Sequence, residues 1–193
     1  MVQHGSGNAI KPNAESLARL KKIWDMDLEL RTFLACVEKL LLCMTKKWRR
    51  WNLITKLPKI KKRATTEWIK AVAESYKRKV GEIGYMFVDD DKILEVNNEY
   101  LGHDYYTDII TFDYCEGDIL NGDIVISLDT VRSNAKKFGK SYEEELYRVI
   151  IHGILHLCGI NDKGPGEREI MEANENAALR LLDEMRVGNE RKG

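Results

Sequence analysis

Hydrophobic positions along the chain follow two periods, one typical of helices and the other of short strands. Apolar residues at helical spacing predict helices over 14–47, 67–80, 92–100, 129–138 and 167–185. Runs rich in β-branched and aromatic residues predict strands over 83–88, 107–112 and 123–128. Short strands that alternate with helices indicate a mixed α/β (α+β) domain, in which helices pack on a small mixed sheet.

A further helix is indicated by its start signal. Ser141 is followed three residues later by Glu144, which is the spacing of a capping box. In that motif each of the two side chains accepts a hydrogen bond from the backbone N–H of the other residue. The apolar run that follows carries His152 and His156 near the C-terminal end of the predicted helix.

The stretch 150–162 carries residues in a metal-binding pattern. His152 and His156 are four apart, so a helix places both imidazoles on one face, about one turn from each other. Gly159 can end the helix in a left-handed conformation, and the chain can then turn back to offer Asp162. Catalytic zinc sites use three such protein ligands and keep a fourth position open. The pattern predicts one Zn²⁺ per chain on His152, His156 and Asp162; the alternative is a chance repeat of core histidines.

The motif identifies a metal site more specifically than it identifies a reaction, because the spacing HxxxHxxGxxD also occurs in zinc proteases. In HExxH proteases the residue after the first histidine is a Glu, which acts as general base on the metal-bound water. Gly153 occupies that position here and has no side chain. A metalloprotease is therefore an alternative that lacks its usual proton acceptor.

Charge is spread unevenly, although 31 basic and 31 acidic residues give the 193-residue chain a net charge of zero. Residues 1–63 hold 15 Lys and Arg against 5 Asp and Glu, whereas the rest holds 16 against 26. A basic segment favours contact with nucleic acid or the ribosome. We expect a basic helical extension at 1–57, one domain at 58–186 and a polar tail at 187–193.

The composition favours a soluble protein of the cytoplasm. The 4 cysteines show neither CxxC spacing nor a secreted disulfide pattern, which fits a reducing compartment. The longest apolar stretch, 33–44, contains two charged residues and is too short to span a bilayer. The start of the chain lacks the apolar core of a signal peptide. We therefore expect no membrane contact.

Three blocks of the sequence match the pattern of a known family and occur in its order. HGILHLCG at 152–159 fits HGxLHLxG, and GDIVIS at 122–127 fits the strand GDI-x-IS. NNEYLGHDYYTDIITF at 97–112 fits the block N-x-x-Y-R-x-x-D-x-x-T-D-V-L-S-F. Over 60–182 the chain thus resembles the YbeY family of bacterial rRNA maturation factors, which are metal-dependent endoribonucleases.

The resemblance implies a single-strand-specific endoribonuclease domain at 58–186 that acts in rRNA maturation, at the 3′ end of 16S rRNA, and in ribosome quality control. It also implies that the metal helix lies against the sheet and that the strand 107–112 borders the metal cleft. The implied partners are rRNA and the small ribosomal subunit. No small-molecule cofactor is expected.

Two positions depart from the family pattern. Asp162 stands where the family usually has a third His; an oxygen ligand suits Zn²⁺ but can shift the metal preference. Leu101 stands where the family has an Arg thought to meet RNA phosphate, and Leu cannot pair with an anion. Because the transition state needs a cation besides the metal, we consider His103, Lys163 and Arg168 as substitutes.

The sequence is therefore consistent with three functions. The resemblance favours an endoribonuclease, and the ligand spacing alone also fits a metalloprotease. Leu101 and the basic N-terminal side favour a non-catalytic ribosome-assembly factor whose metal is structural. Within the nuclease hypothesis, either water or the ribose 2′-OH can serve as the nucleophile.

Overall fold

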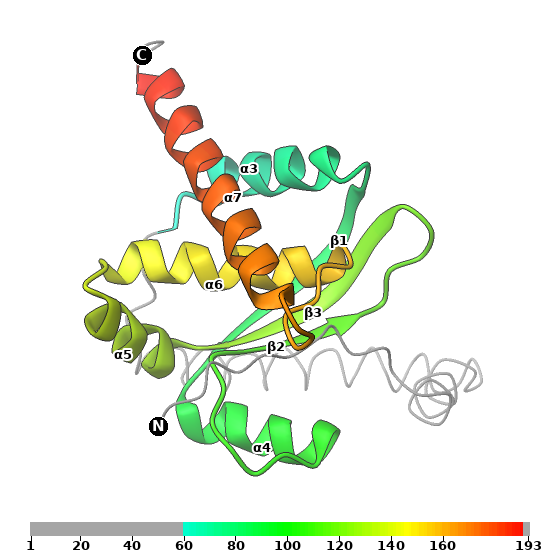
Figure 1. The fold of residues 1–193 in the computed structure, drawn as a ribbon, viewed down its shortest axis with the longest axis vertical. Helices are drawn as coiled ribbons and strands as arrows, with labels where there is room; N and C mark the ends of the chain where they lie inside the picture. Colours follow the sequence, from blue (N-terminus) through cyan, green and yellow to red (C-terminus); the bar gives the residue numbers. More distant parts are fainter. Residues whose placement is uncertain (1–59, 191–193) are drawn as a thin grey trace, which may run out of the picture. The chain divides into compact units, whose positions relative to one another are not determined.

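The computed structural model describes residues 60–190, in which five helices pack with one three-stranded sheet (Figure 1). The predicted extension at 1–57 and the last three residues of the chain lie outside the described residues. In chain order the elements are α3 (Lys62–Ser75), β1 (Lys79–Val88), α4 (Asp90–Leu101), β2 (Ile109–Asp113), β3 (Ile119–Ser127), α5 (Leu128–Phe138), α6 (Tyr142–Leu157) and α7 (Glu167–Glu190).

The sheet is small and mixed, which confirms the predicted fold class. Its strand order is β1-β3-β2, with β1 parallel and β2 antiparallel to the central strand. Ile124 of β3 is flanked by Tyr85 of β1 and Thr111 of β2. Parallel neighbours need a crossover connection, and here α4 and β2 lie between β1 and β3 in the sequence.

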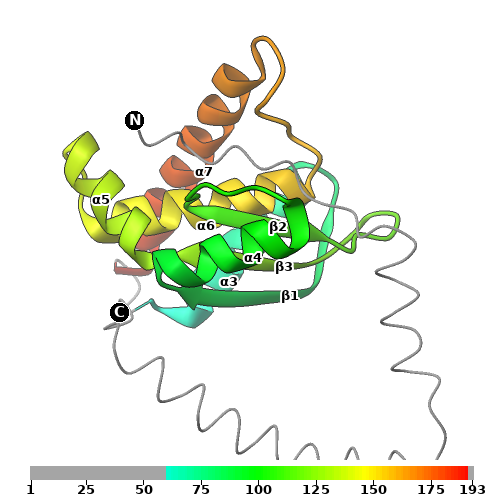
Figure 2. The ribbon, with the colours of Figure 1, turned by 90° about the horizontal axis from the view of Figure 1, so that it is seen from below.

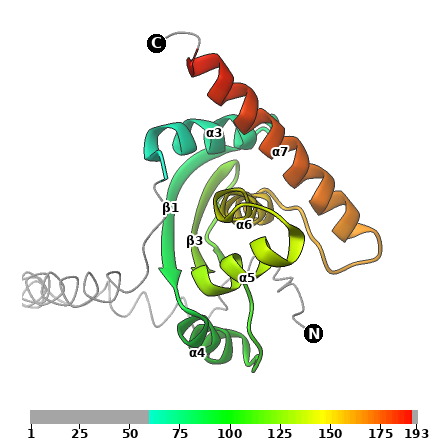
Figure 3. The same ribbon diagram turned by 90° about the vertical axis from the view of Figure 1, so that its left-hand side faces the viewer.

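Different helices cover the two faces of the sheet (Figures 2 and 3). Ile109 and Ile124 point into the main core, which they share with α3, α6 and α7. Ile110 and Val125 point to the other face and pack with Ile93 of α4. This alternation follows from the period of two along a strand. As a result α6 is buried on one sheet face and α4 covers part of the other.

The boundary between α3 and β1 differs from the prediction. The helix occupies Lys62–Ser75 rather than 67–80, and the strand already begins at Lys79. Lys77 adopts a φ of 58°, which ends the helical path, and Val80 then pairs with Leu120 of β3. The prediction was wrong for 76–80 because helical spacing is a local signal, whereas this pairing partner is distant in sequence.

The other elements predicted within residues 60–190 are present, with shifts at their ends, whereas the helices predicted over 14–47 lie outside the described residues. Asp89 caps α4 by accepting a hydrogen bond from the backbone N–H of Lys92, so its carboxylate has a structural role. The last helix continues to Glu190, so the first residues of the predicted polar tail are helical. Within residues 60–190 the structure contains no helix long and apolar enough to span a membrane.

Candidate metal centre

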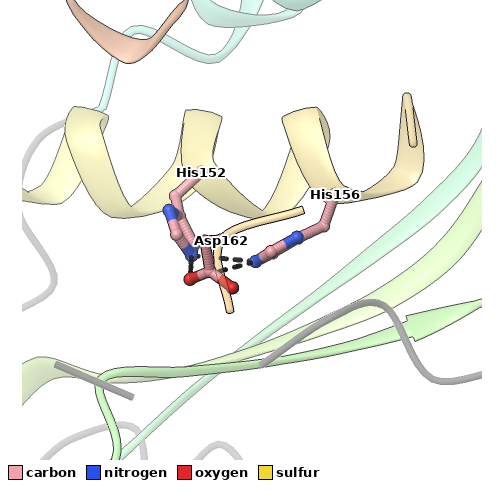
Figure 4. Close-up of side chains that lie close together, drawn as sticks. All are labelled: His152, His156 and Asp162. Carbon is pink, nitrogen blue, oxygen red and sulfur yellow. Dashed lines mark hydrogen bonds and ion pairs between the residues drawn. The ribbon is translucent and has the colours of Figure 1, made fainter. Parts of the chain in front are cut away.

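The helix α6 begins at the predicted capping box. The backbone N–H of Glu144 donates to Ser141 Oγ at 3.1 Å, and the backbone N–H of Ser141 donates to Glu144 Oε2 at 2.9 Å. The helix ends at Leu157, and Gly159 takes a φ of +93°, in the region that favours glycine. The chain then turns back along the helix, and this return places Asp162 opposite the two histidines (Figure 4).

His152, His156 and Asp162 converge on one point. His152 Nε2 lies 2.9 Å from His156 Nε2 and 3.6 Å from Asp162 Oδ2, and His156 Nε2 lies 3.9 Å from the same oxygen. Ligand atoms of a tetrahedral zinc ion, bound at about 2.0–2.2 Å, lie about 3.3–3.6 Å from one another. The three separations bracket that range. This group could therefore hold a metal ion.

Hydrogen bonds on the far side of each imidazole fix its orientation. His152 Nδ1 donates to Glu175 Oε1 at 2.7 Å, and His156 Nδ1 donates to the backbone carbonyl oxygen of Ile160 at 2.9 Å. Because both acceptors are oxygens, each Nδ1 carries a proton, so a neutral imidazole has its lone pair on Nε2, the atom that faces Asp162. Such outer partners orient the ligands of protein metal sites.

Burial and nearby charge set the protonation of these groups. Burial and the charge of His152 lower the pKa of His156 to about 3, so its imidazole is neutral at physiological pH. Burial also disfavours the charged form of His152, but the hydrogen bond and charge of Glu175 outweigh it and raise its pKa. Burial raises the pKa of Asp162, against the opposing charge of His152. A bound cation would offset the cost of burying these groups. It would attract the ionised carboxylate of Asp162 and replace the proton on the imidazole of His152.

Two of the three candidate metal donors, His152 and Asp162, line a pocket of about 390 Å³. Its walls come from the residue before β2, the end of α5, the residue before the cap of α6, one side of α6, the returning loop and the first turns of α7. The lining residues are Asp108, Phe138, Lys140, Glu145, Arg148, Val149, His152, Asp162, Arg168, Met171, Glu172 and Glu175. Asp108 directly precedes β2, so the strand predicted at 107–112 borders the site.

The three cations considered as substitutes for the family Arg lie in different places. Arg168, in the first turn of α7, lines the pocket. Lys163 is exposed, follows Asp162 directly and does not line the pocket. His103 lies in the loop after α4, where its ring stacks on that of Tyr105 with centroids 5.0 Å apart. Leu101 packs against the cluster around α4. Arg168 alone of the three lines the same pocket as the metal donors.

Several charged pocket residues were not identified from the sequence, among them Lys140, Glu145, Arg148, Glu172 and Glu175. Glu145 and Arg148 precede His152 by seven and four residues, so helical spacing already indicated a shared face. Glu175 comes from α7, 23 residues after His152, and no local pattern points to it. Asp108, which the sequence offered only as part of the block at 97–112, also lines the pocket.

Gly153 lies on the side of α6 that faces the sheet. A Cβ at this position would lie 2.9 Å from Ile109 Cδ1 and 3.0 Å from Ile124 Cδ1. Glycine thus allows a close approach of helix and sheet. A Glu side chain here would start within this packed apolar layer, where an unpaired carboxylate is costly. The packing therefore excludes the general base of an HExxH protease from its usual position.

Comparison with known proteins identifies the family. A family profile described as Endoribonuclease YbeY matches residues 51–183. The Endoribonuclease YbeY of Bacteroides thetaiotaomicron is 71% identical over 126 residues, which cover 65% of this chain and 92% of that protein. The Endoribonuclease YbeY of Phocaeicola vulgatus is 72% identical over 127 residues, which cover 66% of this chain and 92% of that protein.

A solved structure shares the fold of this chain. The solution structure of a Thermotoga maritima protein is 28% identical and covers 71% of this chain and 92% of that chain, with a TM-score of 0.50. The family profile spans well over half of the sequence, and it includes α3 to α6, the three metal donors and most of α7. The chain therefore belongs to the YbeY endoribonuclease family.

Proposed function

We propose that the pocket cleaves single-stranded RNA with the help of one zinc ion held by His152, His156 and Asp162. The observation that carries the proposal is the convergence of these three donors beside a pocket, in a chain whose relatives are named endoribonucleases. Two imidazoles and one carboxylate form a donor set typical of catalytic zinc. With three protein donors, a bound zinc ion would have one ligand position for water or substrate.

The chemistry divides between the ion and the chain. When bound, zinc supplies a Lewis acid for the phosphodiester group and lowers the pKa of a water ligand. Glu175 and the carbonyl of Ile160 hold the imidazoles so that both Nε2 atoms face the same point. Arg168, at the pocket, provides positive charge toward the phosphoryl oxygens. We keep His103 and Lys163 as candidate contacts for RNA outside the pocket.

We further propose ribosomal RNA as the substrate, near the 3′ end of 16S rRNA, and the small ribosomal subunit as the partner in the cytoplasm. This supports roles in rRNA maturation and ribosome quality control. The family resemblance and the basic segment 1–57 support the assignment. That segment would add phosphate contacts to those of the remainder of the chain, in which acidic residues outnumber basic ones.

One other function has a specific observation in its favour. Leu101, at the position of a family Arg, packs its side chain against the cluster of Ile93, Ile110 and Val125 and offers no charge to RNA. A non-catalytic assembly factor with a structural metal would need no such charge. A metalloprotease is disfavoured, because Gly153 faces the sheet.

The test is cleavage of a labelled single-stranded rRNA fragment by protein of known zinc content, with a casein digest in parallel. Cleavage should require about one zinc per chain and disappear in His156→Ala and Asp162→Asn. Asp183→Asn, an exposed acid-to-amide change on α7, is the matched control and should keep full activity.

Product ends identify the nucleophile, since attack by the 2′-OH leaves a cyclic phosphate and attack by water does not. If folded, zinc-loaded protein cleaves neither substrate, the assembly-factor function replaces the nuclease. Digestion of casein alone would favour the protease.

A further inference from the structure

Arg148 lies beside the metal centre on the same helix as its two histidines. It precedes His152 by four residues, which on α6 is one turn, or about 6 Å along the axis. Its side chain is 27% exposed, and it lines the pocket. A guanidinium in this place adjoins any phosphate that approaches the metal donors from the pocket side.

Two hydrogen bonds fix the guanidinium of Arg148. One terminal nitrogen donates to Glu175 Oε2 at 2.8 Å, and the other donates to Asn176 Oδ1 at 2.9 Å. These bonds use two of the five N–H donors of an Arg side chain. The others are available to a ligand, and a group already held in place loses less entropy when it binds one.

Lys140 extends this positive charge toward the start of α6. It precedes the cap residue Ser141, it is exposed, and it lines the same pocket. From the first turn of α6 to His152 the helix rises about 15 Å. Positions along this edge of the pocket therefore run from the metal donors to Arg148 and then to Lys140.

The charge balance of the pocket shows why these two cations matter. The lining contains five carboxylates (Asp108, Glu145, Asp162, Glu172 and Glu175) and three cations (Lys140, Arg148 and Arg168). With all of them ionised the lining has a net charge of −2 and repels a polyanion. A divalent ion at the metal donors would bring this net charge to zero. Burial raises the pKa of Glu145, against the opposing charges of Arg148 and Lys140. Bound phosphates thus depend on the metal and on cations placed along their path.

We propose that Arg148 and Lys140 form a phosphate subsite along α6, which takes the backbone of a single-stranded RNA next to the phosphate at the metal centre. The proposal rests on the proposed nuclease function. It assigns the strand a path along the N-terminal half of α6. A purely structural Arg148 would instead act only through Glu175, by holding the carboxylate that orients His152.

The salt dependence of RNA binding separates these two roles. The probe is a single-stranded 2′-O-methyl RNA with a fluorescent end, which cannot react through its 2′ oxygen, and binding is followed by anisotropy in saturating zinc. Each lost phosphate contact on a single strand lowers the magnitude of the slope of log K against log salt by about 0.7. We expect that loss in Arg148→Gln and in Lys140→Gln, and about twice that loss in the double variant.

Two further variants serve as controls. Arg148→Lys keeps the charge and should keep the slope, although its contact with Glu175 changes. Arg132→Gln removes an Arg of α5 that pairs with Asp129 at 2.7 Å outside the pocket lining, and its slope should equal that of the wild type. Zinc content and circular dichroism are measured for every variant.

Unchanged slopes in folded Arg148→Gln and Lys140→Gln would overturn the subsite. If Arg148→Gln does not fold, Lys140→Gln decides, because its exposed side chain can be changed without disturbing the core. If the wild type binds and cleaves RNA while the slopes stay unchanged, only this inference fails. If the wild type neither binds nor cleaves RNA, the subsite and the proposed nuclease fail together.

Discussion

Glu175→Gln is the most informative single change at the metal centre. One carboxylate oxygen accepts from His152 Nδ1 at 2.7 Å, and the other accepts from Arg148 at 2.8 Å. A Gln side chain has the same shape but only one oxygen, so its NH₂ group must face one of these two N–H donors. The variant therefore loses one charge-assisted hydrogen bond and sets two donors against each other, whichever way the amide is turned.

The expected size of the effect follows from the role of such outer partners. Loss of a partner of a ligand histidine typically costs about 10-fold to 100-fold in metal affinity, or about 1.4–2.7 kcal/mol. Glu175 also stabilises the fold, because it is 8% exposed and neutralises Arg148. The loss of metal affinity and the loss of fold stability can be measured separately. Only the loss of metal affinity changes the free energy of unfolding in a way that depends on the free zinc concentration.

The assay is urea unfolding of wild type and variant, once in chelator and once at a fixed free zinc concentration far above both dissociation constants. The destabilisation by Glu175→Gln should be larger in zinc than in chelator by about 1.4–2.7 kcal/mol. Glu172→Gln, an exposed pocket residue one turn earlier on α7, is the matched control and should show no such difference. Equal destabilisation of Glu175→Gln with and without zinc would refute the orienting role.

Three other changes test the fold and its charges. Gly153→Ala should destabilise the protein relative to Gly188→Ala by about 1–3 kcal/mol in urea unfolding, because the first methyl meets the sheet and the second meets open space; equal values would contradict the packing of α6. Trp68→Phe removes a buried hydrogen bond of 2.7 Å to a carbonyl of α7 and should cost about 1–3 kcal/mol, whereas a change below about 0.5 kcal/mol would make this bond unimportant. Burial raises the pKa of Glu145 in the folded state, so this group stabilises the fold below its unfolded pKa of about 4.3, and that stabilisation is lost as pH rises through the folded pKa. The free energy of unfolding of Glu145→Gln, relative to the wild type, should therefore increase as pH rises from about 4 toward 8. A relative free energy of unfolding that decreases over this range would contradict a raised pKa of Glu145.

The grouping of His152, His156 and Asp162 could be predicted because the three residues belong to one short segment. The capping box of Ser141 and Glu144 starts the helix, the interval between His152 and His156 is one turn, and Gly159 returns the chain. Each of these signals acts over fewer than five residues, so local rules apply without knowledge of the fold. The strands and most helices follow from equally local periods.

The rest of the site depends on contacts between distant parts of the chain. Glu175 reaches His152 because α7 packs on α6, and this packing is decided by apolar surfaces rather than by the pattern around either residue. His103 and Lys163 are near motif residues in sequence, yet neither lines the pocket, because neighbours along a loop can point in different directions. The start of β1 at Lys79 likewise required knowledge of its partner strand.

The close contact of α6 with the sheet also limits which reactions this scaffold can acquire by mutation. A carboxylate placed after the first histidine would meet the buried side chains of Ile109 and Ile124, so it would need smaller residues on two strands at the same time. Each single step toward that arrangement loses stability before any new proton acceptor is in position. Any mutational route from this protein to a peptidase of the HExxH type thus passes through less stable intermediates, even though the two share their ligand spacing. The identity of the reaction is preserved here by the hydrophobic core beneath the helix as much as by the polar groups in the pocket.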